Sequence, residues 1–139
     1  MKRLLAGSAL ALLPALMSLA CAATVSVTVK NITGQKGSVR GVLCDKEHFL
    51  KACAYKANAR AAGGEAVLVF SDVPPGRYAV SAYHDENDNG KLDRNFIGIP
   101  SEGYGFSRDA KGRRGPPGFD DAAFDVRDGA NELAVTLNY

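Results

Sequence analysis

A short acidic stretch, residues 85–93, holds the side chains best suited to binding chemistry. Carboxylate and amide residues occupy alternate positions, so their oxygens can converge on one side of the chain, and Gly90 permits a sharp reversal. Hard oxygen ligands of this kind suit calcium, and a backbone carbonyl can add another oxygen. The pattern predicts a calcium site formed by Asp85, Asn87, Asn89, the backbone of Lys91, and Asp93.

The spacing of this stretch matches the first nine positions of an EF-hand-like calcium loop. Position twelve, where a bidentate Glu is expected, is Phe96, and a strand rather than a helix leads into the loop. The pattern therefore predicts a weak site, with a dissociation constant of roughly 10⁻⁴ to 10⁻³ M. The alternative is an Asp/Asn/Gly turn that needs no metal.

A second candidate is the long stretch of residues 98–120, which is rich in glycine, aromatic and basic residues. Loops of this length are usually functional or disordered. Aromatic and arginine side chains could form a binding patch. Alternatively, the aromatic rings plug the open end of the fold and the basic residues are only solvated, and we favour this second interpretation. The candidate binding residues are Tyr104, Phe106, Arg108, Arg113, Arg114 and Phe119.

Motifs of common enzymes are not found in the sequence. There is no Gly-x-Ser-x-Gly, no His-Glu-x-x-His and no phosphate-binding glycine loop followed by Lys. The two histidines are His48 and His84. We therefore expect a binding or structural module with no catalytic site. The alternative is a small periplasmic hydrolase or isomerase that uses His84 and the nearby carboxylates as acid and base.

The first 22 residues have the features of a signal peptide. Lys2 and Arg3 precede an apolar run over 4–19, and a small-x-small cleavage site ends at Ala22. The run is short for a membrane span and Pro14 interrupts it. We expect a periplasmic or secreted protein with residues 23–139 as one domain and no transmembrane segment after cleavage.

Cleavage after Ala22 would leave 15 basic and 15 acidic residues. A neutral mature chain excludes nucleic acid as a partner, and it excludes strong general attraction to anionic membranes. The expected partner is an unknown protein or glycan in the cell envelope.

Two of the three cysteines, Cys44 and Cys53, lie in the mature chain. An even number in an oxidising compartment favours a disulfide, which would stabilise the fold by about 2.7 kcal/mol on the chain-entropy model. Two alternatives are a metal site that also uses His48, and a lipidated Cys21.

Alternating and continuous apolar runs predict seven short strands. Gly63-Gly64 suits a two-residue hairpin, and the last two strands are expected to pair around Asp128-Gly129. A helix over 52–62 is the alternative for the third strand. The prediction is an all-β, seven-stranded antiparallel β-sandwich. Its strands cover residues 24–32, 38–44, 55–61, 65–70, 77–84, 122–126 and 132–138.

Several motifs together resemble one bacterial family of secreted proteins, the domain of unknown function 2141 (DUF2141). They lie at residues 76–80, 84–93, 95–100, 104–107 and 115–122. The resemblance covers essentially the whole mature chain. It implies an exported β-sandwich of the transthyretin-like or immunoglobulin-like type with no established activity. Residues 74–93 also resemble, over a shorter stretch, the calcium-binding B-type repeats of bacterial surface adhesins.

Overall fold

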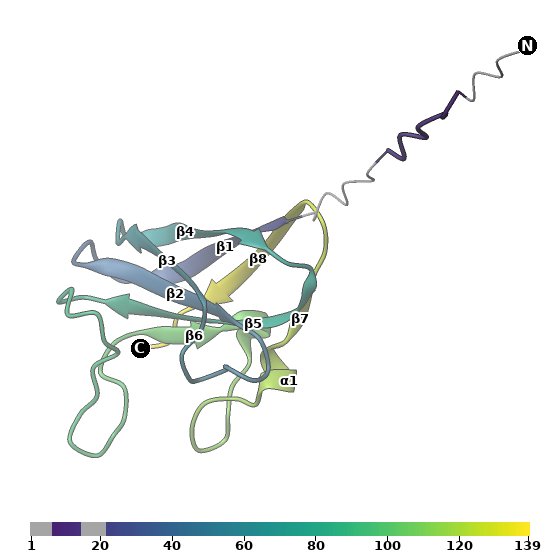
Figure 1. Cartoon of the computed structure of the whole chain (residues 1–139). Coiled ribbons are helices and arrows are strands. Elements are labelled where there is room, and N and C mark those ends of the chain that lie inside the picture. The colour runs from purple at the N-terminus through teal and green to yellow at the C-terminus, as the bar shows by residue number, and fades with distance from the viewer. Residues whose placement is uncertain (1–6, 15–21) are drawn as a thin grey trace, which may run out of the picture.

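The computed structural model describes residues 7–14 and 22–139 (Figure 1). Most of the predicted signal peptide, residues 1–22, lies outside this described part of the chain. Among the described residues, no helix has the length and apolarity needed to cross a membrane.

Two β-sheets enclose the core, which confirms the all-β prediction (Figure 1). The smaller sheet has the strand order β4 (Gly64–Val73), β1 (Ala23–Ile32) and β8 (Ala130–Thr136). The larger sheet has the order β3 (Tyr55–Arg60), β2 (Ser38–Cys44), β5 (Gly76–Asp85) and β6 (Tyr104–Phe106), and β7 (Phe124–Val126) also pairs with β5. The 3₁₀ helix η1 (Ser107–Asp109) and the short helix α1 (Phe119–Ala122) follow β6.

The main core lies between the sheets and follows from the alternation of the strands. Val25, Val27 and Val29 of β1 are fully buried, whereas the residues between them are partly exposed. They pack in one cluster with Leu43 of β2 and Leu68 of β4. Alternate residues of a strand point to opposite faces, so the apolar set of β1 faces the larger sheet.

A second, smaller core lies on the other face of β5. Ala79, next to the main-core residue Val80, packs with Phe106, Phe119 and Phe49. The chain segments 45–53 and 107–123 therefore cover one end of the outer face of the larger sheet. This covering explains why β5 is buried on both faces near its middle.

The strand count and the pairing differ from the prediction. The described residues form eight strands, because the three-residue β6 lies within the stretch that was expected to be a loop. The sheets are not wholly antiparallel, since β8 runs parallel to β1 from Thr24↔Ala130 to Lys30↔Thr136. The reason is the route of the chain: the Gly129 carbonyl accepts a hydrogen bond from the Thr24 amide, so β8 starts beside the start of β1.

The two predicted strand pairs were also wrong. Gly63 and Gly64 do have the left-handed φ values expected, +71° and +87°, and residues 55–60 form a strand rather than a helix. However, β3 and β4 belong to different sheets, so this turn carries the chain across the core. Likewise, β7 and β8 do not pair with each other but with β5 and β1.

Candidate functional site

The acidic loop begins with Asp85, the last residue of β5, whose side chain is fully buried. Its Oδ2 atom accepts hydrogen bonds from Arg40 Nε at 2.7 Å and from the Gly90 amide at 2.8 Å. Its Oδ1 atom accepts one from the Asn89 amide at 3.1 Å. The left-handed φ of Gly90, +77°, allows the turn that brings its amide there. One buried carboxylate thus orders the backbone of the loop, and Arg40 balances its charge.

The remaining predicted calcium residues contact one another through hydrogen bonds. Asp93 accepts bonds from the side-chain amides of Asn89, at 2.7 and 2.9 Å, and Asn87, at 2.7 Å. These bonds, that from Asn89 foremost, hold the pKa of Asp93 below its ordinary value. The Lys91 amide donates to Asn89 Oδ1 at 2.9 Å. Within the described residues, no group of three or more His, Cys, Asp or Glu side chains is placed to hold a metal.

Glu102 is a residue of this loop region that the sequence did not reveal. Its side chain is buried, with 5% of the residue exposed, and burial raises its pKa above the ordinary 4.5. The two carboxyl oxygens accept hydrogen bonds from the amides of Glu86 and Asp93, each at 3.2 Å. Glu102 therefore clamps together the two ends of the acidic loop.

His84, the base in the alternative enzymatic hypothesis, lies near the end of β5 and is fully buried. Its Nε2 donates to the Lys36 carbonyl at 2.6 Å, because a carbonyl can only accept, and its Nδ1 lies 2.8 Å from the Tyr139 hydroxyl. Both ring nitrogens are thus engaged within the fold: Nδ1 holds Tyr139 and Nε2 holds the backbone of Lys36 against β5.

The aromatic residues of the second candidate stretch divide into two groups. Phe106 and Phe119 belong to the second core, where both rings meet Phe49 edge-on at centroid distances of 6.2 and 5.7 Å. Tyr104 is only partly buried and packs against the edge of this core. The plug interpretation therefore describes Phe106 and Phe119, while Tyr104 remains available at the surface.

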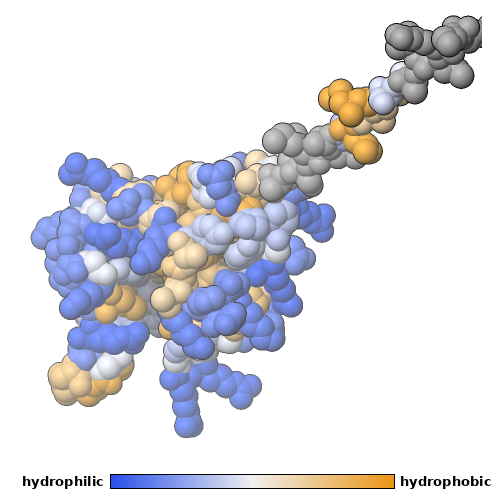
Figure 2. Space-filling view, in the orientation of Figure 1, coloured by the Kyte–Doolittle hydropathy of each residue, from blue (hydrophilic) through white to orange (hydrophobic). Residues whose placement is uncertain are grey.

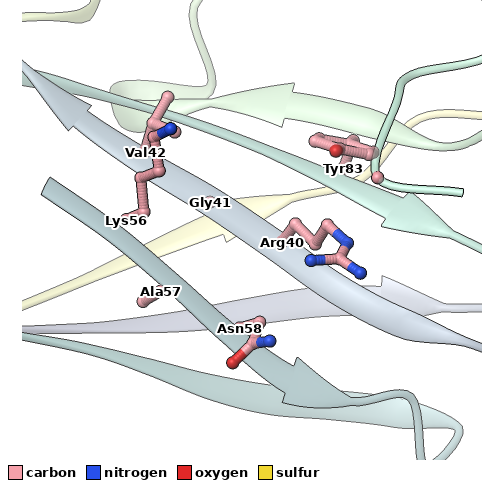
Figure 3. A pocket seen from close by; sticks show the side chains of 8 residues that line it. Arg40, Gly41, Val42, Lys56, Ala57, Asn58 and Tyr83 are labelled. Atoms are coloured by element: carbon pink, nitrogen blue, oxygen red, sulfur yellow. The ribbon is translucent and has the colours of Figure 1, made fainter. Parts of the chain in front are cut away.

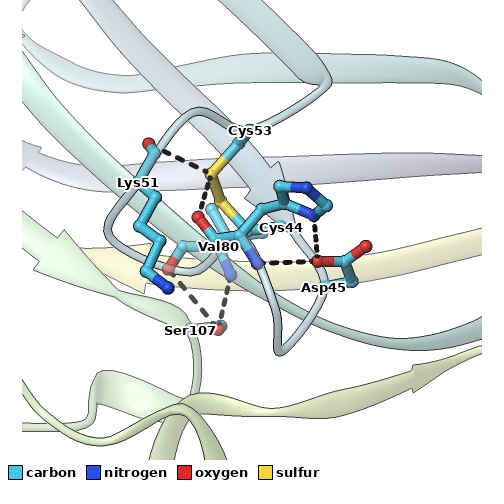
Figure 4. Close-up of a disulfide and its surroundings, with 7 residues drawn as sticks. Cys44, Asp45, Lys51, Cys53, Val80 and Ser107 are labelled. Carbon is cyan, nitrogen blue, oxygen red and sulfur yellow. Dashed lines mark hydrogen bonds and ion pairs between the residues drawn. A yellow bond between two sulfur atoms is a disulfide. The ribbon is translucent and has the colours of Figure 1, made fainter.

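Ser107 and the disulfide fix this second core from two sides (Figure 4). The Val80 amide donates to Ser107 Oγ at 2.9 Å, and this hydroxyl donates to the Ala122 carbonyl at 2.6 Å. Cys44 and Cys53 are joined to each other, as predicted, with their Cα atoms 5.1 Å apart. The His48 ring is hydrogen-bonded to Asp45 instead of the sulfurs, at 2.7 Å.

A cleft of about 490 Å³ lies between two loops on the outer face of the larger sheet. The first wall is the loop of residues 86–103 and the second wall is the loop of residues 107–118; we call the space between them the interloop cleft. Its floor includes Tyr83, Tyr104 and Phe106. Its walls bring together the guanidinium-bearing residues Arg94, Arg113 and Arg114 and apolar residues including Leu92 and Ile99.

Two features make this cleft polar as well as apolar. The lining contains three arginines and no acidic residue, and all three arginines are exposed. Ser81 also lines the cleft, and its hydroxyl oxygen is buried with no hydrogen-bond partner among the described residues. Of the predicted binding residues, Tyr104, Phe106, Arg113 and Arg114 line the cleft, whereas Arg108 and Phe119 do not.

A second hollow of similar volume, about 490 Å³, lies on the neighbouring part of the same sheet (Figure 3). Figure 3 shows Arg40, Asn58 and Tyr83 projecting from three adjacent strands around it. Arg40 is already paired with Asp85. This hollow therefore offers fewer free charged groups than the interloop cleft. We take the interloop cleft as the candidate functional site.

One comparison with known proteins gives a match. The family model described as "Uncharacterized protein conserved in bacteria (DUF2141)" matches residues 27–134. No curated protein and no solved structure matches the chain.

Proposed function

The chain belongs to the DUF2141 family of uncharacterized bacterial proteins, and from that premise we propose that it is an exported binding module whose ligand occupies the interloop cleft. The ligand joins an apolar or aromatic body to an anionic group. The observation that carries this proposal is the convergence of three exposed arginines, without any acid, over an aromatic floor.

The chemistry of the lining supports this ligand class. Tyrosine and phenylalanine faces bind flat apolar groups, and guanidinium groups bind carboxylate, sulfate or phosphate through paired hydrogen bonds. A cleft of about 490 Å³ has the size of an ordinary small-molecule site.

The probe for this proposal is 8-anilinonaphthalene-1-sulfonate, which combines two aromatic groups with a sulfonate. We expect its fluorescence to rise on binding and the double variant R113Q/R114Q to weaken its affinity about tenfold or more, the value of a lost hydrogen bond to a charged group. The control R60Q/R127Q removes the same charge at exposed positions outside the cleft. Equal affinities for the two double variants would contradict the proposal, and thermal melts confirm that both variants fold.

Export and the finer fold type complete this proposal. The Cys44–Cys53 disulfide and the signal-peptide pattern of residues 1–22 support a periplasmic or secreted location. The two sheets packed around the main core support a β-sandwich of the transthyretin-like or immunoglobulin-like type, with one parallel strand pair added.

Calcium binding by the acidic loop is a second proposed property. It is supported by the placement of Asp85, Asn87, Asn89 and Asp93 around one tight turn. The residues fit calcium only if the loop rearranges. The asparagine nitrogens rather than their oxygens face Asp93, and the buried Asp85 carboxylate is already bonded to Arg40 and to the Asn89 and Gly90 amides. Rotation of the asparagine amides would also break the bonds that their oxygens accept from the Lys91 and Asn89 amides, so calcium would have to replace these bonds as well as the two donors of Asp93.

A thermal melt with and without calcium tests this property. For a dissociation constant of about 10⁻⁴ M, calcium at about 10 mM should stabilise the folded chain by about 2.7 kcal/mol. The variant Asp93→Ala should lose this effect, whereas Glu86→Ala, which alters a neighbouring acid that is not a predicted ligand, should keep most of it. A melting temperature that ignores calcium in the unaltered chain would leave the loop as a metal-free turn.

A further inference from the structure

We propose that the interloop cleft opens onto a membrane-docking face, on which an apolar tip enters the surface of an anionic lipid bilayer and a basic loop binds its headgroups. The apolar tip is the turn of residues 95–99, which contains Phe96, Ile97 and Ile99. The basic loop is residues 111–114, which contains Lys111, Arg113 and Arg114.

The apolar tip exposes its side chains in a fixed conformation. Phe96 is 99% exposed and Ile97 is 64% exposed. The Asn95 side-chain oxygen accepts hydrogen bonds from the amides of Ile97 and Ile99 at 3.1 and 3.0 Å. The Asn95 amide also donates to the Ile99 carbonyl at 2.8 Å. The backbone of the tip is thus held in a closed turn, with Phe96 and Ile97 at its apex, where the described residues leave both side chains largely exposed.

The basic loop projects on the same side of the molecule as the apolar tip. Figure 1 shows the two long loops projecting to the same side of the larger sheet, and in Figure 2 the end of one is hydrophobic and the end of the other is hydrophilic. The two loops face each other across the interloop cleft, to which Ile99 and Arg113 both contribute. The apolar apex and the cations therefore lie at neighbouring ends of one protruding face.

The cations on this face are free to bind an external anion. Within the described part of the chain, the cations Arg94, Lys111, Arg113 and Arg114 form no ion pair. One guanidinium nitrogen of Arg94 donates to the Gly98 carbonyl at 3.1 Å, which leaves its other donors for a ligand. The nearby acids are engaged elsewhere: Asp93 is bound by asparagine amides, and Asp109 accepts a hydrogen bond from the Thr136 amide at 2.9 Å. After leader cleavage the chain would have no net charge, yet this face is locally basic. The absence of net charge excludes a general attraction to anionic membranes but not binding through this one face.

This arrangement favours a bilayer over a protein as the occupant. A projecting apolar apex gains nothing from a flat surface but enters the soft boundary between headgroups and acyl chains. Cations beside that apex then lie at the level of the lipid phosphates, where each contributes about fivefold to affinity. A protein partner would need an apolar socket and a ring of acids matched to both loops.

The membrane proposal rests on the proposed function only through Arg94, Arg113 and Arg114, because the same arginines are proposed to bind the cleft ligand and the lipid headgroups. Phe96 and Ile97 do not line the interloop cleft. The variant Phe96→Ser should therefore impair membrane docking and leave the affinity for 8-anilinonaphthalene-1-sulfonate unchanged. This difference separates a failure of the membrane proposal from a failure of the cleft proposal.

The experiment is co-sedimentation of the exported protein with vesicles of phosphatidylcholine alone or mixed with phosphatidylglycerol. We expect binding to the mixed vesicles that weakens with added salt, and little binding to phosphatidylcholine alone. Phe96→Ser should reduce binding about tenfold or more, and R113Q/R114Q about thirtyfold. The controls are Val67→Ser, which alters an exposed apolar side chain of β4, and R60Q/R127Q; neither should reduce binding.

Two results would overturn the proposal. One is the absence of phosphatidylglycerol-dependent binding by the unaltered protein; if the protein then self-associates through Phe96 in analytical ultracentrifugation, the tip binds a second copy instead. The other is equal loss of binding in Phe96→Ser and Val67→Ser, since the tip would then have no special role. Retained dye binding alongside either result would leave the cleft proposal standing.

Discussion

Phe119→Ala should destabilise the fold strongly, because Phe119 is a central member of the second core. Phe119 is only 9% exposed. The centroid of its ring lies 5.7 Å from that of Phe49 and 6.0 Å from the guanidinium carbon of Arg77. Truncation of a buried phenylalanine costs about 3–5 kcal/mol, which includes the transfer of the ring and the cavity left behind. At about 4 °C per kcal/mol for a domain of this size, the melting temperature should fall by about 12–20 °C.

The assay is urea denaturation, with thermal melts in parallel, and Phe96→Ala provides the matched control. Phe96 is the same residue type but is 99% exposed, so its truncation should change the free energy of unfolding by less than about 0.5 kcal/mol. Similar small shifts in both variants would refute the reasoning. Phe119 would then be a surface residue, and the interpretation of the whole 98–120 stretch as a binding patch would return.

Two further predictions concern the disulfide and the acidic loop. Under non-reducing conditions the intact mass should lie two hydrogens below that of the reduced protein, and reduction should lower the free energy of unfolding by about 2.7 kcal/mol; two free thiols in exported protein would contradict the pairing of Cys44 with Cys53. Burial raises the pKa of Glu102 in the folded state, so its contribution to stability is present below pH 4.5 and is lost as the pH rises through the folded pKa. In urea titrations, the unaltered protein should therefore lose stability relative to Glu102→Gln as the pH increases through this range. The raised pKa would be contradicted if the difference in the free energy of unfolding stayed constant, or if it changed in favour of the unaltered protein.

The strands could be predicted from the sequence, but their partners could not. In β1 the alternation of valine with polar residues reports which side chains face the core, and the structure confirms it. A positive φ at Gly63 and Gly64 was also correctly predicted. The same backbone conformation serves a hairpin or a crossing between sheets, however, and only the packing of the whole chain selects between them.

The candidate site shows a similar limit. In the sequence, nothing distinguishes Phe106 and Phe119 from aromatic residues that bind a ligand on a loop. Their burial depends on contact with Phe49, which is more than fifty positions away from either residue. In the first wall of the cleft, Leu92 lies within the stretch that the sequence linked to calcium and Arg94 lies just after it, so neither was predicted to line a binding site. Glu102 lies between two of the family motifs, residues 95–100 and 104–107, but belongs to neither, so its role as a clamp follows from the fold alone.

The acidic loop and the interloop cleft are structurally connected, because β5 and the chain segment that follows it contribute residues to both. Ser81 and Tyr83 of β5 lie on the cleft floor, Asp85 ends the strand and orders the loop, and the next turn delivers Leu92 and Arg94 to the first wall. Glu102 ties the Asp93 amide, one residue before Arg94, to the base of the same loop. Any cation that tightens the acidic loop must therefore fix the first wall and restrict Arg94, so calcium stabilisation and ligand affinity should change together if both proposals hold.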